Sequence, residues 1–493
     1  MKYLLLILSV LAGLSRAETV EMLPPQPLAQ SIMAPSLPDI SMYNLQWVKN
    51  KRPKLDSPPT IALEKIYDIN AFQEFSKGIR AIEWVKRQTT YPQAIVIKYG
   101  VATLDDLVKQ VDGKYFQRLA DGVYISRLPI IISSKATLII SKDTNADKLL
   151  LSQTKGAFIL NAGNVFFIET QIIGWDEHRN APAFFKHKKS FRPFITGQGL
   201  SNTHLVASTF KHLGYFQSKS YGVLLTSVPK KHSDAVHDNP NGWFIDNFFE
   251  DIYYGFYSYE AEDTVIVGNT YFDNIVYGID PHDYSKRLVI ANNTTHKTRQ
   301  LHGIIVSRGV EDSWIFNNKS FDNNGNGVVL DRQSKNNVIA YNHSYNNKGD
   351  GITLFESPDA LIYGNVIHNN GKHGIRIRNS QHVTSAKNII KGNGQLGVYI
   401  YTADPNGKER GLVLDPYVKK ASYASIHDQF IHNKSGALGS DKLYPLVVSG
   451  AFLRVSSDKS GAMFTGGYAP FNQKILKAIE KDNKAVAFVK KGE

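Results

Sequence analysis

The chain has 493 residues, with 57 Lys and Arg, 44 Asp and Glu, a formal net charge of +13 and no cysteine. The lack of cysteine excludes disulfides, thiol catalysis and thiolate metal sites, so a hydrophobic core must stabilise the fold, and a chain of this length can bury a large one. The basic balance favours a polyanionic partner, although charge of this size also serves solubility.

Residues 1–17 have the pattern of a secretory signal peptide. A basic start at Met1 and Lys2 precedes an apolar run that ends at Leu14 and is too short to span a bilayer, and the small residues Ser15 and Ala17 mark a cleavage site. Cleavage after Ala17 leaves 55 basic against 44 acidic residues, a net charge of +11. Because no later stretch is long and apolar enough to cross a membrane, the sequence predicts an exported protein without a transmembrane segment in the mature chain.

Two segments lead into the main body of the chain. Residues 18–60 are spaced by prolines and show no sustained periodicity, so we expect an extended or poorly ordered segment without catalytic groups. Residues 61–200 are expected to form an N-terminal cap and the first coils of a repeat fold. Within them, Thr103 can cap a short helix with Asp106 near its positive end, and this helix could close the open end of a stack of strands.

The sequence between residues 201 and 440 repeats itself without helical periodicity. An apolar segment that ends in asparagine recurs at Asn269, Asn292, Asn318, Asn342 and Asn365, with spacings of 23, 26, 24 and 23 residues. A glycine that precedes apolar residues recurs at Gly255, Gly278, Gly303, Gly327, Gly351, Gly374 and Gly397. Each unit holds two or three short strands, which predicts an all-β fold, a right-handed parallel β-helix with coils of about 23–25 residues.

Other repeat folds fit less well. Leucine-rich repeats need a Leu/Asn spacing that is missing, and propeller blades are nearly twice as long. The recurring asparagines fit a ladder of amide hydrogen bonds from coil to coil. The pattern loosens through residues 405–410, which have the composition of a loop insertion, and residues 441–493 are predicted to cap the solenoid with a helix over 472–481.

The glycines set the register of the predicted strands. Side chains alternate along a strand, so residues one and three positions after each glycine share a face, and this set is apolar and must face the interior. The residues two and four positions after the glycine, with the one that follows them, are then expected to face solvent. They are Tyr257, Tyr259 and Glu260; Asp280, His282 and Asp283; Ile305, Ser307 and Arg308; Val329, Asp331 and Arg332; Thr353, Phe355 and Glu356; Arg376, Arg378 and Asn379; Tyr399, Tyr401 and Thr402.

This outward face is a strip of aromatic and charged side chains about 30 Å long, since neighbouring strands lie roughly 4.8 Å apart. Tyrosines offer flat surfaces to sugar rings, and arginines offer bidentate partners to carboxylates. We therefore predict substrate contacts from Tyr257, Tyr259, Ser307, Asp331, Arg332, Arg376, Arg378 and Tyr399. An ordinary solvated sheet is the alternative interpretation.

The tetrapeptide Asp280-Pro281-His282-Asp283 interrupts the repeat. A proline cannot donate to a strand ladder, and two carboxylates around a histidine add nothing to packing. The register places His282 and Arg308 on adjacent coils, close enough to act on one sugar residue. We therefore predict that Asp280, His282, Asp283 and Arg308 are catalytic.

A histidine, an arginine and a carbohydrate polyanion indicate removal of the proton next to a carboxylate. Arg308 would neutralise that carboxylate, His282 would be the base, and Asp280 or Asp283 would orient the imidazole. Return of a proton from the opposite face gives C-5 epimerisation, whereas loss of the group at C-4 gives β-elimination, and the residues do not separate the two. A glycoside hydrolase needs two carboxylates at a set separation, and a metal-dependent lyase needs an acidic cluster, which the arginine-rich strip argues against.

The motifs around these residues resemble a known family. The segments 276–283 and 302–308, with similar stretches at 327–332, 350–357 and 373–379, resemble those of the periplasmic mannuronan C-5-epimerases of alginate biosynthesis. The likeness covers most of the mature chain and is densest from 240 to 400. It is weakest at 401–440 and in the proline-rich start.

The resemblance implies that poly-β-D-mannuronate becomes polymer with α-L-guluronate in the periplasm, without a metal or other cofactor. It implies that His282 is the base, that Arg308 neutralises the carboxylate and that water returns the proton. The implied partners are the anionic polysaccharide, polymannuronate or alginate, and proteins of an export complex; nucleic acid is not among them. Two alternatives stay open, a polyuronate lyase and a scaffold that guides the polysaccharide without catalysis.

Overall fold

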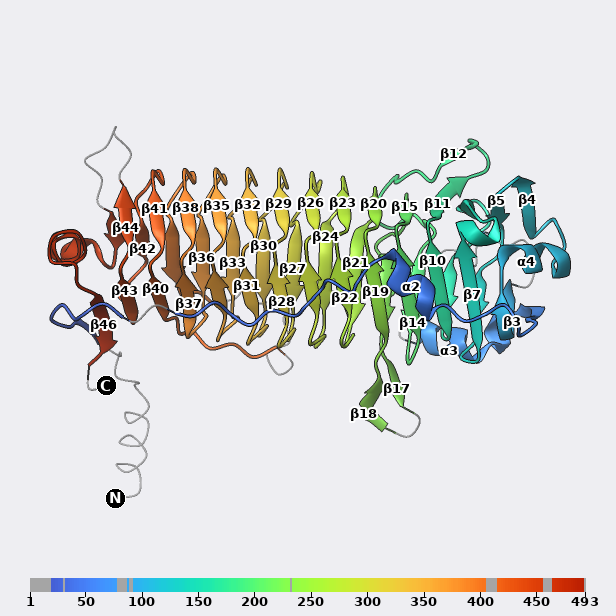
Figure 1. The fold of residues 1–493 in the computed structure, drawn as a ribbon, viewed down its shortest axis with the longest axis horizontal. Coiled ribbons are helices and arrows are strands. Elements are labelled where there is room, and N and C mark those ends of the chain that lie inside the picture. Colours follow the sequence, from blue (N-terminus) through green and yellow to red (C-terminus); the bar gives the residue numbers. More distant parts are fainter. Residues whose placement is uncertain are drawn as a thin grey trace, which may run out of the picture.

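The computed structural model describes residues 19–29, 32–77, 87, 92–230, 233–404, 415–454 and 463–491. The expected signal peptide and the core of the expected loop insertion, residues 405–410, lie outside the described residues. The molecule is a long stack of coils whose strands lie side by side along its length (Figure 1). The predicted parallel β-helix is therefore confirmed. Among the described residues, no helix is long and apolar enough to cross a membrane.

Each central coil contributes one strand to each of three parallel sheets, as β24 (Tyr277–His282), β25 (Val289–Ala291) and β26 (Thr294–His296) do. We call the sheets that contain these strands the groove sheet, the strap sheet and the third sheet. The groove and strap sheets are joined at β3 (Gln93–Ala102), which pairs with a strand of each. A given position in one coil therefore lies directly above the same position in the next.

The other strands of the groove sheet are β2 (Thr60–Lys65), β6 (Ile130–Ile132), β9 (Ile159–Asn161), β13 (Ile195–Gln198), β16 (Gly222–Thr226), β21 (Tyr254–Tyr259), β27 (Ile304–Ser307), β30 (Val328–Asp331), β33 (Ile352–Phe355), β36 (Ile375–Arg378), β39 (Val398–Tyr401), β42 (Leu438–Ser440) and β45 (Phe464–Gly466). Those of the strap sheet are β1 (Val20–Met22), β7 (Ala136–Ser141), β10 (Asn164–Ile168), β14 (Asn202–Val206), β19 (Asn241–Ile245), β22 (Val265–Val267), β28 (Trp314–Phe316), β31 (Val338–Ala340), β34 (Leu361–Tyr363), β37 (Val383–Ala386), β40 (Tyr423–Ile426), β43 (Leu446–Ser449) and β46 (Val486–Lys490). Those of the third sheet are β4 (Phe116–Ala120), β5 (Val123–Ser126), β8 (Lys148–Ser152), β11 (Gln171–Asp176), β12 (Ala181–Pro182), β15 (Thr209–Lys211), β20 (Phe248–Glu250), β23 (Thr270–Phe272), β29 (Lys319–Phe321), β32 (His343–Tyr345), β35 (Val366–His368), β38 (Ile389–Lys391), β41 (Gln429–Ile431) and β44 (Phe452–Arg454); β17 (Val228–Lys230) and β18 (Ser233–Asp238) form a separate hairpin.

The predicted register holds in the central coils. Ile304 and Val306 pair with Val328 and Leu330 of the next coil, and all four side chains are fully buried in one continuous core. The recurring glycine sits where two coils approach most closely, since a Cβ on Gly278 would lie 2.5 Å from a carbonyl oxygen of the next coil. Apolar alternation and glycine together therefore produce a stack with one core along its whole length.

The asparagine ladder is confirmed, with one correction. The side-chain oxygen of Asn318 accepts from the backbone N–H and the side-chain amide of Asn293 at 2.9 and 3.0 Å, and the pattern repeats from coil to coil. The prediction that Asn292 belongs to this ladder is wrong: the exposed Asn292 turns the chain with φ of 56°, and its neighbour Asn293 is the ladder residue. The members are Asn247, Asn269, Asn293, Asn318, Asn342, Asn365 and Asn388.

Short helices close the two ends of the stack. At α4 (Leu104–Gln110), the side chain of Asp106 accepts from the backbone N–H of Thr103 at 2.9 Å, as a capping box requires, and Leu107 enters the main core. At the other end, α5 (Asn472–Leu476) continues as a π-helical turn over Lys477–Lys481 and buries Ile475. Both predicted end helices are therefore present. Another helix, α3 (Asn70–Ser76), buries Phe72 and Phe75 in a cluster separate from the main core, against Phe158 and Phe194. The 3-10 turns are Ile66–Asp68, Lys142–Thr144 and Ala469–Phe471.

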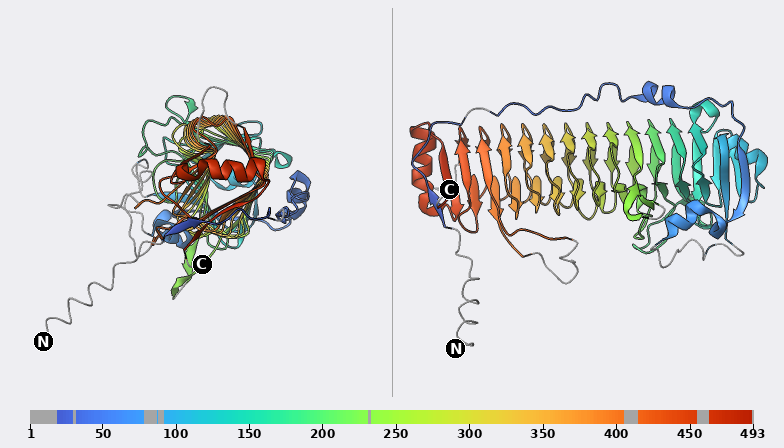
Figure 2. Two further views of the ribbon diagram at one scale, coloured as in Figure 1. Left: turned by 90° about the vertical axis from the view of Figure 1, so that its left-hand side faces the viewer. Right: turned by 90° about the horizontal axis from the view of Figure 1, so that it is seen from below.

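The proline-rich start forms an extended strap, residues 23–29 and 32–44, along the outer face of the strap sheet (Figure 2). It begins beside the C-terminal strand, where β1 pairs antiparallel with β46, and ends in α2 (Leu45–Lys51), a helix that the sequence did not predict. Leu37, Ile40 and Tyr43 pack on an apolar strip that includes Val289 and Phe316. The strap keeps this strip away from water.

Candidate active site

The tetrapeptide opens a gap in the strand ladder of the groove sheet. Strand β24 pairs with β27 at Ile279 and at His282, but Pro281, which has no N–H to donate, makes no such pair between them. Pro281 lies opposite the buried Ser258 of the preceding coil, as the register predicts. His282 therefore stands at the end of a strand, at the edge of the groove.

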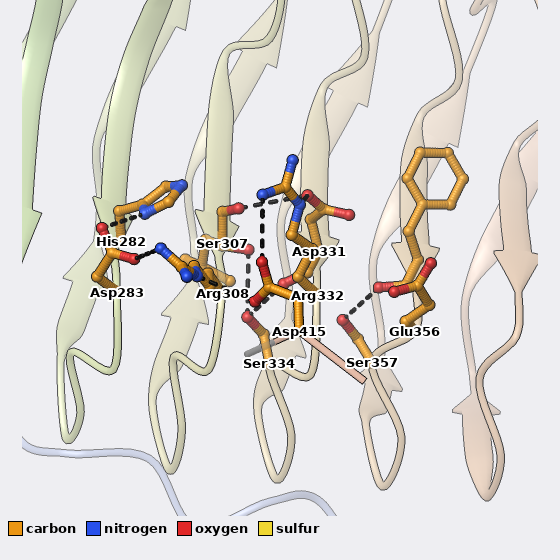
Figure 3. A network of polar contacts seen from close by, with 12 residues as sticks. His282, Asp283, Ser307, Arg308, Asp331, Arg332, Ser334, Glu356, Ser357 and Asp415 are labelled. Atoms are coloured by element: carbon orange, nitrogen blue, oxygen red, sulfur yellow. Dashed lines mark hydrogen bonds and ion pairs between the residues drawn. The ribbon is translucent and has the colours of Figure 1, made fainter. Parts of the chain in front are cut away.

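His282 and Arg308 meet through one carboxylate (Figure 3). The Nδ1 atom of His282 lies 2.8 Å from an Asp283 side-chain oxygen, an ion-pair distance although the contact falls outside hydrogen-bond angles. The other Asp283 oxygen accepts from a terminal nitrogen of Arg308 at 2.8 Å. The second ring nitrogen of His282 points away from Asp283 and is left for chemistry in the groove.

Burial and charge compete at this pair. Burial opposes the charged imidazolium of His282, but the Asp283 contact and the charges of Asp280 and Asp283 outweigh it, so the pKa of His282 is raised. Burial also opposes the charged form of Asp283, yet the contacts with His282 and Arg308 hold the pKa of that carboxyl below its ordinary value. Asp283 is thus a permanent anion beside a base whose proton affinity it increases.

Asp280 differs from Asp283: His282 and Arg308 contact Asp283, whereas among the described residues no charged partner of Asp280 lies within hydrogen-bond distance. Its side chain is 2% exposed, and one of its oxygens makes no hydrogen bond. Burial is the main reason that its pKa is raised to about 8, with the charge of Asp283 adding to the effect and that of His282 opposing it. Asp280 therefore binds a proton more readily than an exposed aspartate does, two residues before the histidine.

Two arginines on adjacent coils share a third carboxylate. The Nε atom of Arg308 donates to Asp415 at 3.0 Å, and the other Asp415 oxygen lies 4.0 Å from a terminal nitrogen of Arg332. Arg332 also lies 3.5 Å from Asp331, whose side chain accepts a 3.3 Å hydrogen bond from Ser307. Asp415 was not among the predicted site residues, because nothing in its local sequence indicates a contact with residues so distant in the chain.

Aromatic side chains form the wall on the N-terminal side of His282. The ring of Tyr257 stacks on His282 with centroids 5.4 Å apart, and Tyr259 meets Tyr257 edge-on at 4.9 Å. Tyr257 also contacts Tyr221, a residue that was not among the predicted site residues. These rings support the imidazole from one side.

The arginines farther along the groove are paired with buried acids. Arg376 lies 2.8 Å from the fully buried Asp350, and Arg378 donates to Glu356 at 3.2 Å. Both guanidinium groups also lie over the ring of Phe355, at 4.9 and 4.1 Å from its centroid. The structure therefore separates Arg376 and Arg378 from the cluster around His282, and Tyr399, one coil further, stacks on His373 at 4.9 Å.

The residue before each glycine adds a row that the sequence analysis did not include. It contains Tyr254, Tyr277, His302 and His373. The Nδ1 atom of His302 accepts from the next coil's backbone at 2.9 Å, and burial lowers the pKa of both His302 and His373 to about 4. These two imidazoles are therefore neutral. The same glycine repeat could have identified this row, because its residues directly precede the glycines.

One part of the predicted outward face is wrong. The residues two positions after the glycine were expected to face solvent, but most of this row is buried: Tyr257, Asp280, Ile305, Val329 and Thr353 are each at most 6% exposed. This row therefore lies below the surface of the molecule rather than on it. Within the described part of the chain, no group of three or more His, Cys, Asp or Glu side chains is arranged to hold a metal ion.

The fold and the groove together define the class, a parallel β-helix protein that gathers a histidine, carboxylates and arginines in one groove. A family model described as a right-handed β-helix region matches residues 283–408. Mannuronan C5-epimerases from Pseudomonas putida and Pseudomonas aeruginosa are 41% and 40% identical, over 96% and 95% of this chain and 90% and 86% of theirs. A crystal structure of the periplasmic alginate epimerase AlgG has a TM-score of 0.81 and 39% identity, and the match covers 86% of this chain and 99% of that one. The chain belongs to the mannuronan C5-epimerase family and is an isomerase.

Proposed function

We propose that the protein converts β-D-mannuronate residues of polymannuronate to α-L-guluronate by proton exchange at C-5, while the polymer passes through the periplasm. The observation that carries this proposal is the contact of one carboxylate, Asp283, with both His282 and Arg308 on adjacent coils. The names of the relatives, mannuronan C5-epimerases and a periplasmic alginate epimerase, support the same substrate and compartment.

In the proposed reaction His282 takes the C-5 proton with the ring nitrogen that points away from Asp283. Asp283 holds the ring and stabilises the imidazolium that forms, and Arg308 offsets the second negative charge that develops beside the substrate carboxylate. A proton then returns to C-5 from the opposite face, and water is the proposed donor. Tyr257, Tyr259, Ser307, Asp331, Arg332, Arg376, Arg378 and Tyr399 are proposed to contact the polymer, and export proteins to be its partners.

A β-elimination would begin with the same proton transfer, so the products decide between the two reactions. Purified protein is incubated with polymannuronate in deuterated buffer. Epimerisation gives a guluronate H-1 signal in the proton NMR spectrum and deuterium at C-5, whereas elimination gives unsaturated ends that absorb in the ultraviolet. Absorbance without the guluronate signal would establish a lyase instead.

A scaffold that only guides the polymer is separated by one variant. His282→Ala should bind polymannuronate and lose deuterium exchange at C-5. His382→Ala is the matched control, because His382 is exposed and contacts only surface groups such as Asp359 at 3.0 Å. If the wild type and His382→Ala never incorporated deuterium, the scaffold would be the better interpretation.

A further inference from the structure

A carboxylate of the protein itself occupies the space between Arg308 and Arg332 (Figure 3). One Asp415 oxygen accepts from Arg308 at 3.0 Å, and the other lies 4.0 Å from Arg332. The Asp415 side chain is 11% exposed, while those of the two arginines are 29% and 44% exposed. Arg308 and Arg332 therefore form a notch that holds one carboxylate and opens to the groove.

The position of this notch suits a uronate carboxylate. Arg308 is bound on one side by Asp283, which contacts the imidazole, so a carboxylate in the notch lies one guanidinium away from His282. A planar guanidinium presents donors on two edges, and here one edge serves Asp283 and the other serves Asp415. Any substrate carboxylate that approaches Arg308 on its second edge meets Asp415.

The other arginine pairs of the groove do not share this property. Asp350 and Glu356 belong to the coils, lie under their arginines and are 0% and 3% exposed, so they neutralise Arg376 and Arg378 permanently. Asp415 instead comes from a segment outside the coils, 107 residues after Arg308 in the chain. Its neighbour Pro416 accepts a hydrogen bond from Gln333, so the segment is attached beside the notch rather than inside the stack.

We propose that Arg308 and Arg332 together bind the carboxylate of the sugar residue that reacts, and that Asp415 is an internal competitor that fills this notch in the free protein. The inference rests on the proposed function and deepens it. Displacement of Asp415 by a uronate exchanges one carboxylate for another, so the two neighbouring guanidinium groups are never left without an anion between them. Because Asp415 competes with every uronate carboxylate, it lowers the affinity for all uronates equally. Uncharged sugars cannot displace Asp415, because they bring no negative charge to the two arginines.

The test measures binding separately from catalysis, in the His282→Ala background. Two proteins are compared by isothermal titration: His282→Ala with Asp415 intact, and His282→Ala that also carries Asp415→Asn. Each is titrated with a mannuronate oligomer and with a neutral β-1,4-mannan oligomer of the same length. Removal of the competing charge should raise the affinity for the uronate oligomer about tenfold and should raise that for the neutral oligomer much less. Arg332→Ala in the Asp415→Asn background should abolish most of this gain.

The matched control is Asp404→Asn, in the same part of the chain. Asp404 accepts from Lys419 at 2.7 Å and from Tyr417 at 2.9 Å, so its loss disturbs the segment without touching the notch. Equal gains from Asp404→Asn and Asp415→Asn, or an unchanged or weaker uronate affinity of Asp415→Asn, would overturn the inference. Epimerisation that survives His282→Ala would instead overturn the proposed role of His282 as the base and leave the binding comparison intact.

Discussion

The contact of Asp283 with both functional groups yields the sharpest prediction, for the variant Asp283→Asn. The asparagine keeps the size of the side chain and removes the charge that lies 2.8 Å from His282 and 2.8 Å from Arg308. Close pairs of opposite charge couple by about 1.5 kcal/mol or more, and the variant loses this stabilisation of the imidazolium that forms during the reaction. We expect kcat/KM to fall by about 10- to 100-fold.

The pH profile gives a second readout that a merely structural defect would not produce. Asp283 raises the pKa of His282, and the base works only when neutral, so the activity of the wild type falls as pH decreases through that raised pKa. Without Asp283 the pKa decreases, and the acid limb of kcat/KM moves to lower pH. The loss of activity is therefore largest on the alkaline side and smaller on the acid side.

The assay follows guluronate H-1 by proton NMR across the pH range, with thermal unfolding to exclude misfolding. Asp263→Asn is the control, because Asp263 binds Arg287 at 2.7 Å on an exposed turn outside the groove. An acid limb that stays in place in Asp283→Asn, or an activity within twofold of the wild type, would refute the assignment of Asp283 to His282.

Three further predictions test the other contacts. Arg308→Lys should lower kcat/KM by about 100-fold with intact folding, because lysine cannot bind two carboxylates on two edges; equal activity would contradict it. Asn318→Ala should lower the free energy of unfolding by about 3 kcal/mol in urea titrations, since it leaves buried amides of two neighbouring coils unpaired, whereas the exposed Asn324→Ala should cost nothing measurable. Burial lowers the pKa of His204 to about 3, so below about pH 6.5 the unfolded chain binds protons that the native state does not; stability should fall by about 2 kcal/mol from this residue at pH 5, and His204→Phe should remove that loss.

The sequence predicted the repeat and its register because both follow from local spacing. The glycine that recurs in every coil and the alternation of apolar residues determine which side chains enter the core. This register correctly placed His282 and Arg308 on adjacent coils. The choice between Asn292 and Asn293 failed, because two adjacent amides satisfy the same spacing and only the turn geometry distinguishes them.

Two other features could not be read from the sequence. The burial of Asp280 depends on how the chain around it packs, and the contact of Asp415 depends on where a distant segment attaches. Both are tertiary properties without a local signature. Where the proline-rich start packs was equally hidden, since its apolar residues are few and widely spaced.

The pairing of β1 with β46 makes the two ends of the chain depend on each other. In a plain solenoid each coil contacts only its neighbours, so coils can stack as soon as they emerge. Here Val20 pairs with Lys490, so the first strand has no partner until the last has been made. In a chain that emerges from its N-terminus, the pairing of β1 with β46 can therefore form only after the last strand has been made. A nick or truncation near residue 486 should consequently loosen the opposite terminus. The pairing of β1 with β46 thus couples the two ends, so that the coils unfold as one cooperative unit.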